Sequence, residues 1–132
     1  AAVLSVKLQK LNKYNRSRNN AANYYDQVFS EIEELQTPVR VENSTHVFHQ
    51  YTLRVLNGQR DALQKHLMDN GVPAMIYYPL HQQKAYRDDR YQDGAFPVAE
   101  QLAKEVISLP MHTELDEDQL GYITEKVKEF FK

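Results

Sequence analysis

Two tyrosines and a histidine surround a proline turn near the middle of this sequence. The segment IYYPLHQQ contains Tyr77, Tyr78 and His81. The apolar run AMIYY, residues 74–78, predicts a short strand that Pro79 ends, and phenol and imidazole groups at a strand end are typical of small-molecule pockets. The same side chains could instead serve only the fold, with the tyrosines in the core and His81 hydrogen-bonded to the turn. Their spacing does not decide between the two interpretations.

The other histidines do not have the spacing of a metal site. His46 and His49 are three residues apart, which suits two ligands on a helix. The alternating pattern from 46 to 56 predicts a strand, however, and on a strand these two side chains point to opposite faces. His66 is expected on a helix among polar neighbours and His112 in a loop, both exposed to solvent. No metal site is predicted.

The charged residues are explained by ordinary structural roles. Arg54 could bind a carboxylate or a phosphate through its guanidinium group, but pairing with an acidic neighbour across the sheet is the commoner role. The acidic residues between 114 and 118 do not follow calcium-loop spacing, and carboxylates are favoured at the start of a helix by its dipole. The sequence contains no G-x-S-x-G, no glycine-rich phosphate loop and no H-E-x-x-H motif.

Composition limits the class of protein. The chain has 132 residues, 42% of them hydrophobic and 26% charged, which is typical of one soluble domain with its own core. A net charge of −2 argues against a dedicated nucleic-acid partner. No apolar run reaches the roughly 18 residues of a membrane span, and no signal peptide is recognisable, so no membrane partner is expected. The absence of cysteine is compatible with a cytoplasmic location.

The first 35 residues predict one long helix. At 1.5 Å per residue such a helix would measure roughly 50 Å, whereas a compact domain of this size is about 35–40 Å across. Part of its apolar stripe should therefore need a partner, either missing chain or a second subunit. Since no capping residue precedes it, the chain is expected to begin inside a helix. The stripe consists of Leu4, Leu8, Leu11, Ala22, Tyr25, Phe29 and Ile32.

Turn and cap signals divide the rest of the chain. Gly71 is placed as the left-handed end of one helix, Pro97 as the first residue of another, and Asp116 with Gln119 as the capping box of the last. The predicted fold class is α+β, with a small sheet of about three strands packed against helices. The expected elements after the long helix are a strand at 46–56, a helix at 59–70, a strand at 74–78, a helix from 97, a strand at 107–109 and a helix from 116.

Several segments, taken in order, resemble the DegT/DnrJ/EryC1/StrS family. Members of this family are aminotransferases that use pyridoxal phosphate and act on keto sugars linked to nucleotides. The resemblance extends over essentially the whole chain. The segments that carry it are AAVLSVKLQKL, FHQYTLRV, RDALQKHLMDNGVPAMIYYP, LHQQKAY, FPVAEQLAKEVISLPMH and the last helix through EFF.

The resemblance implies an architecture and a reaction. It implies a type I aminotransferase fold, with residues 1–35 as an inter-domain helix and 36–132 as the small C-terminal domain. The N-terminal domain with the cofactor-binding lysine would be absent from this chain, so no catalytic or cofactor-binding residue is assigned and the isolated fragment is expected to be inactive. The parent enzyme would transfer an amino group from glutamate to a keto nucleotide sugar for polysaccharide or related amino-sugar biosynthesis, as a homodimer.

The resemblance also gives the proline turn a role. The region of Tyr77, Tyr78 and His81 matches the part of the family that reaches toward the active-site cleft, so these three residues, with His49 as a further candidate, are predicted to line the substrate pocket. Many relatives have a longer turn before the Leu-His pair, and whether His81 occupies the family position stays open.

Two other classes of function remain as alternatives. The chain could be a free-standing interaction module that dimerises through its first helix, or a small regulatory domain that binds a ligand. The first alternative predicts a genuine start just before Ala1. The second predicts that the chain alone binds a sugar nucleotide or an amino acid.

Overall fold

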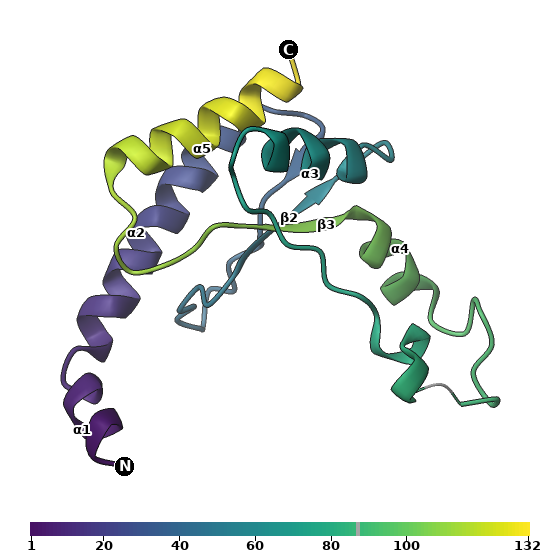
Figure 1. The fold of residues 1–132 in the computed structure, drawn as a ribbon, viewed down its shortest axis with the longest axis horizontal. Helices are drawn as coiled ribbons and strands as arrows, with labels where there is room; N and C mark the ends of the chain where they lie inside the picture. The colour runs from purple at the N-terminus through teal and green to yellow at the C-terminus, as the bar shows by residue number, and fades with distance from the viewer. Residues whose placement is uncertain (87) are drawn as a thin grey trace.

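A computed structural model describes residues 1–86 and 88–132. It has the predicted mixture of helices around one small sheet, and its outline is an arch (Figure 1). One arm of the arch is formed by the first two helices and ends at the N-terminus; the other holds α4 and two short 3₁₀ turns. The elements are α1 (Ala2–Leu8), α2 (Leu11–Phe29), β1 (Leu35–Gln36), β2 (Tyr51–Val55), α3 (Arg60–Asp69), η1 (Leu80–Gln82), η2 (Lys84–Tyr86), α4 (Pro97–Glu105), β3 (Val106–Leu109) and α5 (Glu117–Phe130).

The sheet is antiparallel, and β2 is its middle strand. The order is β1-β2-β3, with Leu35 paired to Val55 and Tyr51 paired to Leu109. Alternate residues of β2 are buried: Tyr51, Leu53 and Val55 all lie on its inward face. The alternation seen in the sequence is therefore confirmed for the centre of the predicted strand.

Three details of the strand predictions are wrong. The strand predicted at 46–56 covers only Tyr51–Val55. The run 74–78 is not a strand: only Met75 forms a bridge, to Ser108, because Pro73 lacks an N–H and the chain leaves the sheet at Pro79. The third strand of the sheet is instead β1, which lies at the end of the predicted first helix.

The long first helix is also shorter than predicted, and it is interrupted. Turn residues at 9 and 10 separate α1 from α2, and α2 ends at Phe29 instead of 35. Acidic residues follow at Glu31, Glu33 and Glu34, and negative charge is unfavourable at the carboxyl end of a helix. The pairing of Leu35 with β2 then fixes this segment as a strand.

The helix signals in the second half of the chain are confirmed. Gly71, which follows the C-cap residue of α3, has a φ of +73°, and Pro97 is the first residue of α4. At the start of α5, Asp116 accepts a hydrogen bond from the Gln119 N–H at 2.8 Å, and the Gln119 side chain accepts one from the Asp116 N–H at 3.2 Å. This reciprocal pair is the predicted capping box.

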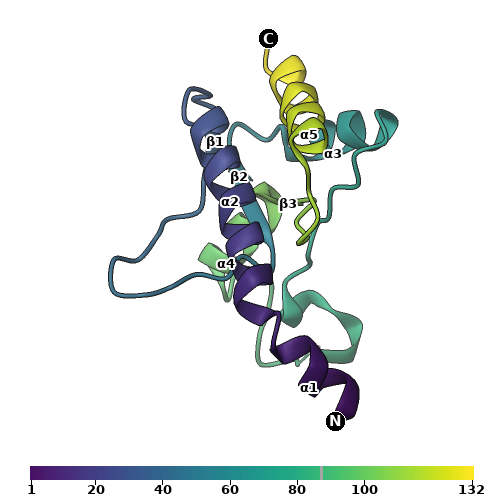
Figure 2. The same cartoon turned by 90° about the vertical axis from the view of Figure 1, so that its left-hand side faces the viewer.

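The core lies where α2, α3 and α5 meet the sheet. Helix α5 packs against α2 and α3 at the top of the arch (Figure 1), and the turned view shows α5 beside α3 (Figure 2). On the other arm, the buried guanidinium of Arg60 closes the end of α4 by donating to the carbonyls of Ala103 at 2.8 Å and Val106 at 3.0 Å. None of the described helices has both the length and the apolar content that crossing a membrane requires. The largest fully buried side chains are Tyr25, Phe29, Phe48, Tyr51, Leu53, Val55, Leu63, Leu67, Ile107 and Val127.

Candidate functional site

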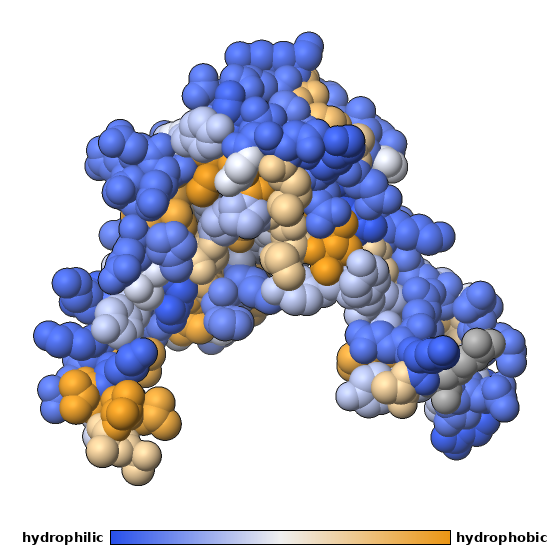
Figure 3. Space-filling model, in the orientation of Figure 1, coloured by the Kyte–Doolittle hydropathy of each residue, from blue (hydrophilic) through white to orange (hydrophobic). Residues whose placement is uncertain are grey.

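Two of the four predicted pocket residues come together at one end of the sheet. His49, just before β2, and Tyr77, just after the bridge at Met75, line the same open pocket of about 310 Å³. The molecule is hollowed between its two arms (Figure 3). The other lining residues are Gln50, Pro73, Met75, Ser108, Leu109, Pro110 and Met111.

The lining of this sheet-end pocket is mostly apolar, with a few hydrogen-bonding groups. Its walls combine an imidazole, a phenol, a carboxamide and a hydroxyl group with two thioethers and two prolines, and no Asp, Glu, Lys or Arg is among its lining residues. Such a lining can donate and accept hydrogen bonds while packing against an apolar ring face. It therefore suits a hydroxylated or heterocyclic ring better than a phosphate or a carboxylate.

His81 lies apart from this pocket and is used within its own arm. Its Nε2 is 3.3 Å from Glu100 Oε1, its ring packs on Phe96 at 4.8 Å, and the side chains of His81 and Glu100 are mostly buried, with 15% and 17% exposed. Glu100 also accepts hydrogen bonds from the N–H groups of Phe96 and Gly94. These backbone donors, the Phe96 N–H first, and then His81 hold the pKa of Glu100 below its ordinary value.

The open side of His81 faces acidic residues. A groove of about 360 Å³ is lined by His81 together with Asp88, Asp89 and Asp93. Tyr78 is 75% exposed and lines neither this groove nor the sheet-end pocket. The predicted site is thus divided: His49 and Tyr77 share a pocket, and His81 and Tyr78 are elsewhere.

Arg54 forms the ion pair that its sequence position predicted. Its Nη2 lies 2.6 Å from Glu105 Oε2, at the end of α4, and its Nη1 donates to Gln36 Oε1 at 2.9 Å. Within residues 1–86 and 88–132, no three potential ligands of the His, Cys, Asp and Glu types gather as a metal ion would require.

His66 was predicted to be exposed to solvent, but in the structure its ring contacts α5. Its Nε2 is 3.0 Å from the Lys126 carbonyl of α5, and its ring packs on Phe130 at 5.6 Å. The cause is the contact between α3 and α5, a tertiary arrangement that neighbours in sequence do not reveal.

Sequence reasoning missed a polar network under the sheet. Tyr51 donates to Asp26 Oδ1 at 2.6 Å, and Arg40 donates to Asp26 Oδ2 through Nε at 3.0 Å and Nη2 at 2.6 Å. Burial first, and then the Asp26 carboxylate, raise the pKa of Tyr51 far above its ordinary value. Tyr25 donates to the Pro110 carbonyl at 3.0 Å. Alternation placed Tyr51 inward, but no sequence signal links Asp26 to Arg40.

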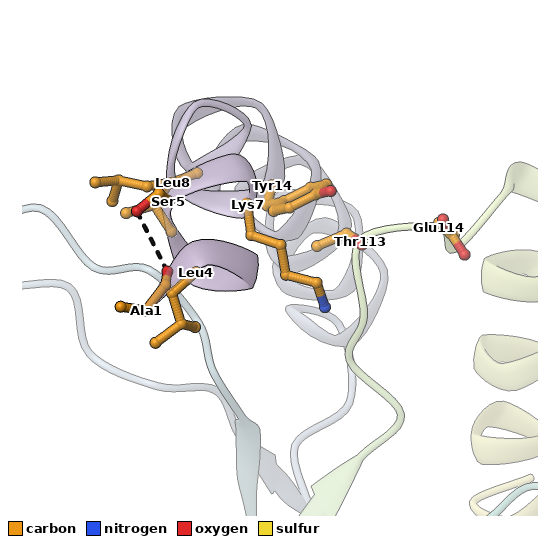
Figure 4. Close-up of a pocket in the computed structure, with 9 residues that line it drawn as sticks. Ala1, Leu4, Ser5, Lys7, Leu8, Tyr14, Thr113 and Glu114 are labelled. Atoms are coloured by element: carbon orange, nitrogen blue, oxygen red, sulfur yellow. Dashed lines mark hydrogen bonds between the residues drawn. The ribbon is translucent and has the colours of Figure 1, made fainter.

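The first arm has a groove of its own. It is lined by apolar residues of α1 and the start of α2, including Leu4, Leu8 and Leu11, and by Thr113 and Glu114 from the loop before α5. Lys7 extends beside Tyr14 toward Thr113 (Figure 4). This groove is the part of the predicted apolar stripe that the described residues leave uncovered.

No lysine among residues 1–86 and 88–132 is buried as a cofactor-binding lysine would be. Pyridoxal phosphate needs a lysine activated by burial or by a neighbouring cation, and clustered N–H donors for its phosphate. Lys65 is exposed and pairs with Asp69, and Glu129 raises the pKa of Lys126, the opposite of activation. Lys7 is exposed. The four glycines, at 58, 71, 94 and 121, are too dispersed in the sequence for a glycine-rich phosphate loop.

Comparison with known proteins identifies relatives over the full chain. Residues 1–128 match the DegT/DnrJ/EryC1/StrS aminotransferase family. A pleiotropic regulatory protein of Geobacillus stearothermophilus is 41% identical, over 100% of this chain and 36% of that protein. UDP-N-acetyl-3-dehydro-α-D-glucosamine 3-aminotransferase of Acidithiobacillus ferrooxidans is 36% identical, over 97% of this chain and 34% of that protein. Two further relatives, 32% and 30% identical, are named as dTDP-amino-sugar transaminases.

A solved structure agrees with the fold. The crystal structure of DesV from S. venezuelae in complex with a ketimine intermediate matches with a TM-score of 0.93 and 29% identity, over 99% of this chain and 35% of that chain. The present chain spans about a third of the length of the relatives it matches. Because the family match covers residues 1–128 of 132, the chain belongs to the DegT/DnrJ/EryC1/StrS aminotransferase family.

Proposed function

We propose that these residues form the small C-terminal domain of a homodimeric aminotransferase that moves an amino group from glutamate to a keto sugar linked to a nucleotide. Pyridoxal phosphate would be held by residues of another domain and would supply the amine carrier. The observation that supports this most strongly is the family match over residues 1–128. Relatives named as UDP- and dTDP-sugar transaminases support the substrate class.

In this proposal the sheet-end pocket contacts the substrate. His49 and Tyr77 supply hydrogen-bonding groups, while Met75 and Met111 supply soft apolar surface for a ring. A lining without Asp, Glu, Lys or Arg is matched to the sugar or the base, the parts of a nucleotide sugar that carry no charge. His81 has a structural part in the proposal, as the partner of Glu100 in the second arm.

A chimera tests this proposal directly. The region of the Acidithiobacillus ferrooxidans aminotransferase that aligns with this chain is replaced by the chain, and amine transfer from glutamate to its keto sugar is measured. We expect an active enzyme. Tyr77→Phe or His49→Ala in the chimera should lower kcat/KM by about tenfold, the loss expected for one hydrogen bond of about 1.4 kcal/mol.

Tyr78→Phe is the matched control, because the Tyr78 side chain is exposed and lines neither of the two pockets described above. It should leave kcat/KM unchanged. A well-folded chimera without any transfer activity would count against the proposed function. Full activity in His49→Ala and Tyr77→Phe would instead remove only the pocket assignment.

A regulatory role is the second candidate, because one relative at 41% identity is named a pleiotropic regulatory protein. This role predicts that the chain alone binds a small ligand. Calorimetric titration of the chain with UDP-N-acetylglucosamine and with glutamate separates the two candidates. Saturable binding of either compound to the chain alone would favour regulation.

A further inference from the structure

The segment that carries His49 into the sheet-end pocket has an unusual backbone. Phe48 has a φ of +46°, in the left-handed region that bulky residues avoid. Its side chain is nevertheless fully buried, at 1% exposed, and packs near Tyr51 with a centroid distance of 6.2 Å. Such a conformation persists only when its surroundings impose it.

Side chains of α2 impose this turn from one side. Arg18 Nε donates to the Val47 carbonyl at 2.8 Å, and Asn19 Nδ2 donates to the His46 carbonyl at 3.0 Å. The Asn19 amide also donates to the Asn15 carbonyl at 2.9 Å, and Arg18 Nη2 donates to Asn15 Oδ1. Each donor is thus fixed to its own helix as well as to the loop.

Two further contacts complete the turn. The Phe48 N–H donates to the ring nitrogen His46 Nδ1 at 3.0 Å, and the Arg40 guanidinium lies over the Phe48 ring at 4.7 Å. Arg40 is itself bound to Asp26 of α2. Residues 46–48 are therefore connected to α2 at several points just before the chain reaches His49.

We propose that Arg18 and Asn19 are positioning residues for His49, acting through the left-handed turn at Phe48. The inference rests on the proposed function, in which His49 contacts the substrate. The direction of the His49 side chain is set by α2, the helix of the first arm, so a change in the position of that helix is transmitted to the pocket. The two hydrogen bonds fix the carbonyls of the exposed residues His46 and Val47, while packing fixes the buried side chain of Phe48.

The test follows the His49 ring in the chain labelled with ¹³C-histidine. Arg18→Ala and Asn19→Ala should each shift the His49 ring cross-peaks and broaden them, while the cross-peaks of His66 and His112, which lie elsewhere, stay in place. Arg18→Lys, which keeps a donor for the Val47 carbonyl, should return the His49 signal part of the way to its wild-type position.

Matched controls come from the same helix. Asn23→Ala and Lys13→Ala remove an amide and a cationic side chain from α2; both residues are exposed, neither lines the groove beside residues 45–47, and their side chains make no hydrogen bond or ion pair with any residue in 1–86 or 88–132. Neither control should move the His49 signal. If the Arg18→Ala, Asn19→Ala double variant is folded by circular dichroism and its His49 signal is unchanged, the inference is wrong.

Failure of the proposed function gives a different pattern. In the chimera, a His49→Ala variant with full activity would show that His49 has no contact with substrate, although its signal in the isolated chain would still respond to Arg18→Ala. If both ideas hold, Arg18→Ala in the chimera should raise KM several-fold, and Arg18→Lys should restore part of that loss.

Discussion

The middle strand and the two arms are stabilised in different ways. In β2, Tyr51, Leu53 and Val55 are each 0% exposed, and the strand is hydrogen-bonded on both edges. In the arms, large apolar side chains such as Leu4 and Leu80 are more than half exposed. Burial in the middle strand should therefore contribute most of the free energy of unfolding, while the arms expose apolar surface that other molecules can bind.

The sheet-end pocket lies at the boundary between these regions. Its floor is the end of β3 at Ser108 and Leu109, both buried, and its rim consists of the exposed residues His49 and Tyr77. A buried floor with exposed side chains at the rim is a common arrangement for a binding site on a small domain. Mutations in the middle strand should accordingly change the free energy of unfolding, and mutations in the arms should change contacts with other molecules.

The largest expected effect is from Leu53→Ala in the middle strand. Removing a fully buried leucine costs the transfer free energy and leaves a cavity, so the free energy of unfolding should fall by about 2–5 kcal/mol. Urea unfolding followed by circular dichroism measures it. Leu80→Ala, the same change in the second arm, should cost less than about 0.5 kcal/mol. Equal losses at the two sites would contradict the comparison.

The centre is also the region that could be predicted from sequence. Period-two alternation placed Tyr51, Leu53 and Val55 on one face, and Gly71 and Asp116 marked helix ends through local chemistry. These signals work because each depends on residues only a few positions apart.

The errors arise where distant residues decide the structure. The pairing of Leu35 with Val55 turned a predicted helical end into a strand, and Pro73 left Met75 with a single bridge. The candidate site could be predicted only by residue type: no local pattern shows that His49 and Tyr77 meet while His81 turns to Glu100. The positive φ at Phe48 could not be predicted, because positive φ is usually signalled by glycine or asparagine and this position is a phenylalanine.

A smaller loss is expected from Tyr51→Phe, which keeps the ring and removes one hydroxyl. The hydroxyl donates to a carboxylate at 2.6 Å, so its removal should cost about 1.5–3 kcal/mol. Tyr24→Phe on the same helix as Asp26 is the control, since Tyr24 is exposed; it should have no measurable effect on urea unfolding. A Tyr51→Phe chain as stable as wild type would show that Arg40 alone satisfies Asp26.

The second arm should show a pH dependence of its own. The pKa of Glu100 is held below the ordinary value of 4.5, mainly by the Phe96 N–H and then by Gly94 and His81. A lowered pKa in the folded state gives stability that is complete above 4.5 and is lost as the pH falls through the folded value. The amide signals of Gly94 and Phe96 should shift in this acid window.

Glu100→Gln should abolish these shifts and leave the far-UV circular dichroism of the chain unchanged. Glu31→Gln, a change at an exposed glutamate after α2, should leave both amide signals titrating as in wild type. Titration of Gly94 that persists in Glu100→Gln would show that another carboxylate is responsible.

The smallest effect on stability is expected in the first arm, from Leu4→Ser with Leu8→Ser. These side chains are 69% and 67% exposed, so the free energy of unfolding should change by less than about 0.5 kcal/mol. Their apolar surface is nevertheless expected to bind a second copy of the chain, because uncovered leucines at steps of four form a continuous stripe. Sedimentation equilibrium should therefore show wild type self-associating and the double variant monomeric. Val98→Ser, an exposed apolar change in the other arm, should leave the association intact; a wild-type chain that stays monomeric would show that the stripe alone does not drive dimerisation.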